Sequence, residues 1–174
     1  MKKVPKKKMV KKDFPFFWTV EQVNAILDNS PNPEHRVTWA LMAFAGLRKD
    51  EAARIGDGDI HDGYIHIIGK GNKMARIPVS RRLSSELERF GKPLPHLRSR
   101  SLTVKKAAKY AGIDFQGEAT NHRFRHSFAS NLIRAGADIK SVQLLMRHEN
   151  VEITLNTYSH LLGEDLEKAV DKIG

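Results

Sequence analysis

Cysteine is absent from this 174-residue chain, so neither disulfides nor thiolate-bound zinc can stabilise it. Long apolar runs are also missing, and none approaches the roughly 18–20 residues that a membrane-spanning helix requires. The N-terminus is rich in lysine but lacks the apolar core of a signal peptide, which predicts a cytoplasmic protein with no membrane partner. Hydrophobic residues make up 40% of the chain, which is long enough to form one domain with a core.

Positive charge is distributed unevenly along the chain, whose formal net charge is +10. Residues 1–12 contain seven lysines and no acid, and we expect residues 1–13 to form a flexible basic arm. Residues 69–109 contain twelve basic and two acidic residues, whereas residues 13–68 and 149–174 are net acidic. A basic sector on an acidic frame is typical of a protein that binds a polyanion, although a solvated lysine and arginine face has the same composition.

Capping residues and apolar periodicity predict one mainly helical α+β domain over residues 14–174. Thr19 and Gln22 form a capping box that predicts a helix start, and Asn32 predicts a second start, with that buried helix ending near Gly46. The glycine-rich "GKGNK" separates two β-prone runs, which indicates a small β-hairpin or three-stranded sheet. Further helices are expected over 47–56, 80–90, 102–112, 120–136, 138–148, 152–162 and 164–173.

Several short segments carry polar residues where chemistry is possible. Arg48 follows the buried helix and a glycine, Lys70 lies between two glycines, and Tyr158 follows His148 by ten residues. Taken singly, these are a helix-surface arginine, a solvated turn lysine and a packing tyrosine. The "GKGNK" loop also lacks the spacing of a phosphate-binding P-loop.

The segment "HRFRH" is the most polar stretch of a predicted helix. His122 and Arg125 lie one turn apart and share a face, while His122 and His126 have the i, i+4 spacing of a metal-binding pair. Arg123 and Arg125 would repel a cation, and arginines beside histidines suit an anion instead. We therefore predict an anion-binding segment and no metal site.

In this order, the segments resemble the active-site boxes of the tyrosine recombinases, the family of phage integrases and chromosome-dimer-resolving recombinases. "GLRKDE" is similar to their G-L-R-x-x-E box, "GKGNK" to the hairpin with the catalytic lysine, and "HRFRHSFA" to their H-x-L-R-H box. "LLMRHENVEITLNTYSH" resembles their L-L-G-H…Y-x-H ending. Two departures are Arg147, where the family usually has glycine, and a His148–Tyr158 interval one residue longer than in many members.

The resemblance implies the tyrosine recombinase catalytic-domain fold and an enzyme that cleaves and rejoins double-stranded DNA through a 3′-phosphotyrosyl intermediate. It implies site-specific recombination or integration without metal or cofactor, a tetramer on DNA, a monomer when free, and a nucleoid-associated location in the cytoplasm. The family's usual N-terminal DNA-clamping domain is expected to be absent, so DNA binding should be weak and sensitive to salt. The implied catalytic residues are Arg48, Lys70, His122, Arg125, His148 and Tyr158.

The implied residues suit phosphoryl transfer. The two arginines would hold the non-bridging oxygens, and Lys70 would protonate the leaving 5′-oxygen. Positive charge nearby should favour the ionised form of Tyr158, with His122 as the expected base or hydrogen-bond acceptor and His148 bonded to the phosphate or the tyrosine. Supporting roles are expected for Glu51, His126 and His160. The residues expected to contact DNA are Lys73, Arg76, Arg81, Arg123 and Arg147, with Arg123 facing solvent or the DNA backbone.

Other functions stay open on the sequence alone. A DNA-binding accessory protein with an impaired active site, a type IB topoisomerase-like nicking and closing enzyme, and a metal-dependent nuclease all remain alternatives. The predicted last helix, over 164–173, either packs within its own chain or docks on a neighbouring protomer.

Overall fold

The computed structural model describes residues 16–69, 74–91, 94, 102–115, 117–162 and 170. The helices within these ranges are α1 (Val20–Asp28), α2 (Pro33–Ala45), α3 (Lys49–Arg54), α4 (Arg81–Phe90), α5 (Leu102–Tyr110), α6 (Asn121–Arg134), α7 (Ile139–Met146) and α8 (Val151–Leu162). The strands are β1 (Ile60–His61), β2 (Tyr64–Ile68) and β3 (Met74–Pro78), with a short 3-10 turn, η1 (Asp57–Asp59), before β1. This architecture confirms the predicted mainly helical α+β fold with a small sheet. None of the described helices is both long and apolar enough to cross a membrane.

Some predictions fall outside the described residues. They concern the basic arm over 1–13, the "GKGNK" lysines Lys70 and Lys73, and the last helix over 164–173 apart from position 170.

Local sequence signals set the helix starts as predicted. The Thr19 hydroxyl accepts a hydrogen bond from the Gln22 backbone N–H at 3.3 Å, and the Gln22 side chain accepts one from the Thr19 N–H at 3.1 Å. Asn32, Ser80 and Asp138 likewise cap α2, α4 and α7 through their side chains. Each cap satisfies backbone donors that the first turn of a helix leaves without an intrahelical partner.

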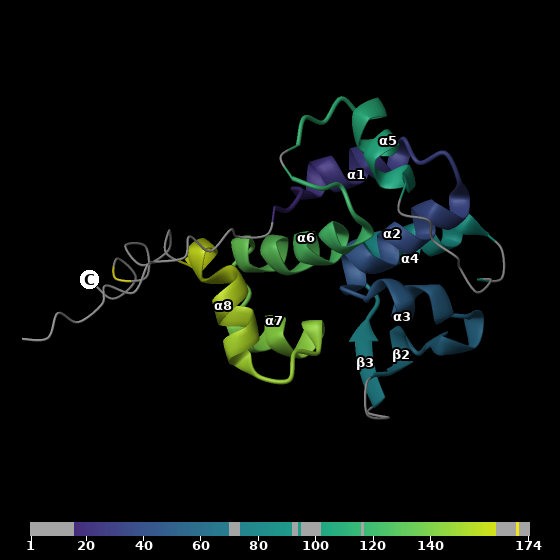
Figure 1. The fold of residues 1–174 in the computed structure, drawn as a ribbon. Helices are drawn as coiled ribbons and strands as arrows, with labels where there is room; N and C mark the ends of the chain where they lie inside the picture. The colour runs from purple at the N-terminus through teal and green to yellow at the C-terminus, as the bar shows by residue number, and fades with distance from the viewer. Residues whose placement is uncertain are drawn as a thin grey trace, which may run out of the picture.

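The centre of the molecule is the long contact between α2 and α6 (Figure 1). The rings of Trp39 and Phe124 stack with centroids 5.3 Å apart, and the Trp39 indole N–H donates to Asn121 at 3.0 Å. The chain entering α1 is tied to the same helix, because the Trp18 N–H donates to the Ser127 hydroxyl at 2.8 Å. The first half of α6 is therefore fixed on two sides, and it is this half that carries "HRFRH".

The small sheet lies beside α3, while α7 and α8 lie beside α6, away from the sheet (Figure 1). Its strands run antiparallel in the order β1-β2-β3, with Ile65 opposite Ile77 on the buried face. A hollow of about 190 Å³ separates α3 from β2, and Glu51 and His66 are among its lining residues. The sheet therefore adjoins the part of α3 that carries Glu51.

Gly46 ends α2 in the left-handed conformation, with φ at 61°. A Cβ atom at this position would lie 2.5 Å from the Phe128 ring, which no side chain tolerates. Only glycine therefore allows α2 to end this close to α6. The close approach turns the Gly46 carbonyl towards arginines of two other segments.

Candidate active site

Segments separated by 21 to 99 residues in sequence meet at the C-terminal end of α2. They are the turn carrying Gly46 and Arg48, the first half of α6, the turn between α7 and α8, and α8 itself. A hydrogen bond joins the turn carrying Arg48 directly to the turn between α7 and α8, because the Arg48 guanidinium donates to the Arg147 carbonyl at 3.3 Å. Three of the predicted boxes, those that carry Arg48, Arg125 and the His148–Tyr158 pair, thus lie together in space within the described residues.

Glu51 is the buried carboxylate of this cluster, and its side chain is only 6% exposed. It accepts the Arg48 N–H at 2.7 Å, the Arg48 guanidinium at 2.8 Å and the Arg147 guanidinium at 2.6 Å. Burial alone would raise the pKa of Glu51, but the Arg48 N–H and the charge of Arg147 hold it below the ordinary value. One ionised carboxylate therefore orients two arginines.

Arg125 lies deeper than the other arginines and is 2% exposed. Its two terminal nitrogens donate to the carbonyls of Gly46 and Met146. Burial, with the neighbouring charges of Arg147 and Arg48, lowers the pKa of Arg125 to about 9, so it remains a cation at neutral pH. Three guanidiniums surround one carboxylate here, and this excess of positive charge suits an anion.

Tyr158 is fully buried in α8, with its hydroxyl 2.9 Å from Nδ1 of His126. Burial raises the pKa of Tyr158 to about 12, although the charge of Arg125 acts in the opposite direction. Burial also lowers the pKa of His126 to about 4, helped by the charges of His122 and Arg125. Both side chains are therefore neutral at physiological pH. The positive charge of Arg125 does favour ionised Tyr158, as expected, but burial outweighs it and the net shift favours the neutral hydroxyl.

His148 begins the link to α8, and its Nδ1 lies 2.8 Å from the Thr154 hydroxyl. Burial and the charges of Arg125, Arg48 and Arg147 lower the pKa of His148 to about 4. Because these charges act on His148, it belongs to the same electrostatic cluster as the arginines. Its ring is held by Thr154 in a neutral state.

His122 lies at the exposed rim of the cluster. Partial desolvation and the charges of Arg125 and Arg48 lower its pKa below the ordinary value. Its ring meets that of His126 edge-on, with centroids 5.0 Å apart. The histidine within hydrogen-bond distance of the tyrosine is thus His126, whereas the sequence indicated His122.

Arg123 does not face solvent or the DNA backbone as predicted. It is 6% exposed, and its guanidinium lies over the rings of Trp18, Phe16 and Phe115 at 4.7, 5.6 and 5.6 Å. The reason is helical geometry, since Arg123 projects from α6 about 160° away from Arg125 at roughly 100° per residue. That side of α6 packs against the aromatic N-terminal segment, so the prediction that Arg123 faces solvent is wrong, while its contact with DNA stays a prediction that this burial does not favour.

Arg147, a further predicted DNA contact, also points inwards. Its side chain is 11% exposed and pairs with Glu51. Of the other predicted DNA contacts, Arg76 and Arg81 are exposed, on β3 and at the start of α4. His160 is half-buried in the last turn of α8.

Two participants escaped the sequence reading, namely the Gly46 carbonyl and Thr154. A backbone carbonyl leaves no signature in a sequence. Thr154 did leave one, because it precedes Tyr158 by four residues and therefore shares its face of α8. Both residues are fully buried.

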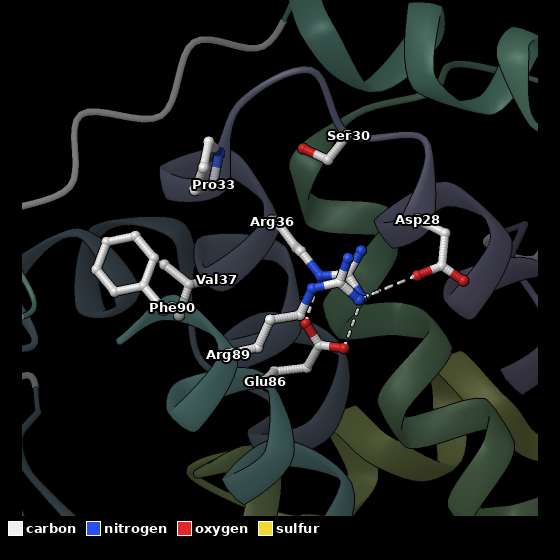
Figure 2. A pocket seen from close by; sticks show the side chains of 8 residues that line it. All are labelled: Asp28, Ser30, Pro33, Arg36, Val37, Glu86, Arg89 and Phe90. Carbon is white, nitrogen blue, oxygen red and sulfur yellow. Dashed lines mark hydrogen bonds and ion pairs between the residues drawn. The ribbon is translucent and has the colours of Figure 1, made fainter. Parts of the chain in front are cut away.

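A separate polar hollow of about 180 Å³ lies at the opposite end of α2 (Figure 2). Figure 2 shows Arg36 between Asp28 and Glu86, to which it is joined by ion pairs of 2.9 and 2.5 Å. Glu86 is also paired with Arg82 at 2.7 Å. These charges are matched to one another across α1, α2 and α4, which is typical of a structural ion-pair network. Throughout the described ranges, no three histidine or carboxylate side chains are arranged to hold a metal ion.

Comparison with known proteins links this geometry to a family. Residues 87–164 match the phage integrase family. The chain is 29% identical over 184 residues to tyrosine recombinase XerA of Pyrococcus horikoshii, covering 94% of this chain and 63% of that protein. It is 30% identical over 176 residues to tyrosine recombinase XerD of Yersinia pestis, covering 84% of this chain and 58% of that protein. The chain thus spans about 60% of the length of these curated relatives.

Solved structures show the same fold. XerH site-specific recombinase bound to its palindromic difH substrate superposes with a TM-score of 0.72 at 19% identity, covering 94% of this chain and 55% of that one. The catalytic domain of bacteriophage HP1 integrase superposes with a TM-score of 0.69 at 22% identity, covering 89% and 93%. At these identities the likeness concerns the fold.

Proposed function

Since this chain belongs to the tyrosine recombinase family, we propose that it cleaves and rejoins DNA strands with Tyr158 as the nucleophile. The observation that supports this most is the convergence of Arg48, Arg125, His148 and Tyr158 at one end of α2. The charge of Arg125 acts on two of the other side chains, because it lowers the pKa of His148 and opposes the rise in the pKa of Tyr158. A phosphodiester placed among the arginines would lie near the buried Tyr158 hydroxyl, the nucleophile that we propose.

The proposed reaction exchanges one phosphodiester for another. The Tyr158 oxygen attacks phosphorus, the bond to the 5′-oxygen breaks, and the freed 5′-oxygen takes up a proton. A 5′-hydroxyl of the same or another strand then attacks the 3′-phosphotyrosyl group and restores the tyrosine hydroxyl. The number of phosphodiester bonds is unchanged, so we propose that neither a metal nor a cofactor takes part.

The side chains divide this chemistry between them. We propose that Arg48 and Arg125 stabilise charge on the non-bridging oxygens, where removal of one preorganised donor typically costs about 3–4 kcal/mol of transition-state stabilisation. Neutral His126, through Nδ1, is the acceptor for the Tyr158 proton, and His148 hydrogen-bonds the phosphate. Lys70 remains the proposed proton donor to the 5′-oxygen. His122, at the rim, is a further proposed phosphate ligand.

Binding of the phosphate is also what would activate the tyrosine. With pKa values of about 12 for Tyr158 and about 4 for His126, proton transfer between them is unfavourable in the unliganded protein. An anion between the arginines favours the protonated form of a nearby imidazole and so raises its pKa. We propose that cleavage begins only when the scissile phosphate is in place.

The proposed substrate is double-stranded DNA, and the curated and structural relatives include recombinases and integrases of mobile elements. XerH was solved with its palindromic difH substrate, and the Tn1549 transposon integrase with circular intermediate DNA. We further propose that this chain is monomeric when free and forms a tetramer on DNA. A cytoplasmic, nucleoid-associated location follows from that substrate.

A nicked suicide substrate tests the proposal. We would incubate the protein with a library of nicked duplexes containing random sequence, so that a short released fragment diffuses away and traps the covalent product. Wild-type protein should yield a denaturation-resistant DNA adduct in the presence of EDTA, and sequencing of that DNA gives the preferred site. Tyr158→Phe should yield none, while Tyr110→Phe, on an exposed tyrosine of α5, should retain it.

The outcomes separate the alternatives. DNA binding without any adduct would contradict the proposed function and favour an accessory DNA-binding protein. Cleavage that EDTA abolishes, with no adduct, would favour a metal-dependent nuclease. An adduct accompanied by relaxation of supercoiled DNA, but without strand exchange between two duplexes, would favour a type IB topoisomerase-like enzyme.

A further inference from the structure

Arg147 adopts a backbone conformation that glycine favours. It ends α7 with φ at 53° and ψ at 44°, which is the left-handed region. This conformation costs an L-residue free energy that glycine avoids. The side-chain contacts of an arginine at such a position must therefore offset the free-energy cost of its backbone conformation.

The Arg147 side chain folds back across the cluster. One terminal nitrogen donates to the Leu145 carbonyl at 2.6 Å, and the other donates to the Gly46 carbonyl at 3.0 Å and to Glu51 at 2.6 Å. The guanidinium thus joins the end of α7 to the end of α2 and to α3. These two ends carry His148 and Arg48, respectively.

The turn after α7 is held by arginines at three successive carbonyls. Arg147 binds the Leu145 carbonyl, Arg125 binds the Met146 carbonyl, and Arg48 binds the Arg147 carbonyl. Two of these arginines, Arg125 and Arg147, also share the Gly46 carbonyl. The position of His148, the next residue, depends on this set of bonds.

We propose that Arg147 is a positioning residue, which locks the α7–α8 turn onto Gly46 and Glu51 and so fixes His148 relative to Arg48 and Arg125. It acts through these neighbours and does not contact the phosphate. The inference rests on the proposed function, because the groups it positions are those proposed to bind the scissile phosphate. It also accounts for the buried side chain at a position expected to contact DNA.

The electrostatic surroundings of His148 provide a readout independent of cleavage. The charged groups acting on its ring are Arg125 from α6, Arg48 from the start of α3 and Arg147, and its Nδ1 is bonded to Thr154 of α8. His126 of α6 also faces it. Removing one of the three positive charges should raise the pKa of His148 towards its ordinary value.

Three variants of the full chain test the proposal. Arg147→Gly is compatible with the left-handed backbone, so it removes the side chain without introducing strain. Arg147→Lys keeps the charge but has no planar fork to reach the two carbonyls and Glu51 together. Arg89→Ala removes an arginine from the exposed side of α4, beside the hollow at the opposite end of α2, and is the matched control.

The measurements are single-turnover adduct formation on a substrate recovered from the nicked library, DNA affinity, and NMR titration of His148. Arg147→Gly should slow adduct formation on the order of 10- to 100-fold, as expected for a misplaced catalytic group. Its DNA affinity should change by less than about threefold, because a positioning residue makes no phosphate contact. Its His148 pKa should rise. Arg147→Lys should recover part of the rate and keep the low His148 pKa, and Arg89→Ala should behave as wild type.

Other results overturn the inference while leaving the proposed function intact. Wild-type adduct formation by Arg147→Gly would show that the lock is not needed. If Arg147→Gly binds DNA more weakly but forms the adduct at the wild-type rate on saturating DNA, Arg147 is a DNA contact instead. If the wild type itself forms no adduct, the proposed function fails, and the NMR signals of the His148 ring decide in Arg147→Lys, which keeps the charge but loses the fork. Unchanged ring signals overturn the lock, and displaced ones support it.

Discussion

The Nδ1 atom of His126 and the phenolic oxygen of Tyr158 lie 2.9 Å apart inside the protein, and both groups are neutral there. The two residues come from α6 and α8 and are separated by 32 positions. In the Nε2–H tautomer, His126 accepts the hydrogen bond that the buried hydroxyl would otherwise lack. This hydrogen bond thus holds the proposed nucleophile neutral and in a fixed orientation.

The pairing predicts different effects for two substitutions at position 126. His126→Phe should leave the Tyr158 hydroxyl without this acceptor, at a cost of about 1–3 kcal/mol of stability. Adduct formation should also fall at least roughly tenfold, since the proposed proton acceptor is lost. His126→Asn retains an acceptor oxygen near the position of Nδ1 and should keep most of the stability. Urea unfolding and adduct assays check both, and equal stability of the two variants would contradict the hydrogen bond.

Buried neutral imidazoles predict that acid destabilises the fold. The pKa values of His126 and His148 are lowered to about 4 by burial first and by neighbouring positive charge second. In the unfolded chain they return to about 6.5, so between pH 6.5 and 4 the unfolded state binds more protons. Their contribution is thus complete above pH 6.5 and is lost as the pH falls towards 4.

Between pH 7.5 and 5.0 we expect a loss of about 1–2 kcal/mol for each imidazole, allowing for partial solvent contact. The ion-paired carboxylates Glu51 and Glu86, whose pKa values lie below the ordinary 4.5, contribute little in this window, because they are mostly ionised above pH 5 in both the folded and the unfolded chain. Urea unfolding followed by fluorescence of the buried Trp18 and Trp39 measures the change. His126→Asn should reduce the pH dependence, and a slope identical to wild type would disprove the assignment.

Gly46→Ala should be among the more destabilising single substitutions. The added Cβ would meet the Phe128 ring at 2.5 Å and would also occupy a left-handed backbone. The left-handed backbone alone costs about 1–2 kcal/mol, and the clash adds to it. Gly112→Ala is the matched control, because it has φ at 68° but no atom within 4 Å of the new Cβ. Thermal unfolding should rank Gly46→Ala clearly below Gly112→Ala, and similar midpoints would refute the close approach.

Salt dependence of DNA binding separates exposed from buried arginines. If Arg76 and Arg81 contact phosphates, replacing either by alanine should lower the slope of log affinity against log salt by about 1. Arg123→Met should leave that slope unchanged, because the guanidinium lies beneath the rings of Trp18 and Phe115. It should instead lower stability. A reduced salt slope for Arg123→Met would mean that this arginine reaches DNA after all.

Much of the fold could be predicted because its signals are local. The capping box of Thr19 and Gln22, the Asn32 cap and the glycine at the end of α2 act within a few residues of the chain. The two hairpin strands were likewise visible as β-prone runs. Boundaries were less accurate, as for α3, which ends at Arg54 and not at the predicted Gly56.

The candidate site could be predicted only in part. The order of the boxes identified Arg48, Arg125, His148 and Tyr158, which the structure brings together. It could not show that Arg123 faces an aromatic layer, because that depends on what packs against α6. Helical spacing also could not choose between His122 and His126, since both share a face of the helix. The family resemblance indicated His122, whereas the position of α8 brings Tyr158 within hydrogen-bond distance of His126.

The sequence by itself determined the residue types, their order, the helix starts and the family resemblance, because each follows from neighbouring residues or from matching motifs. Only the tertiary structure decided the charge states and the directions of side chains. Desolvation and the distance between charges are properties of the packed interior, where Tyr158 becomes harder to ionise and the arginines are held by Glu51 and the Gly46 carbonyl. The sign of the shift in the pKa of Tyr158 was therefore set by burial, which no motif records.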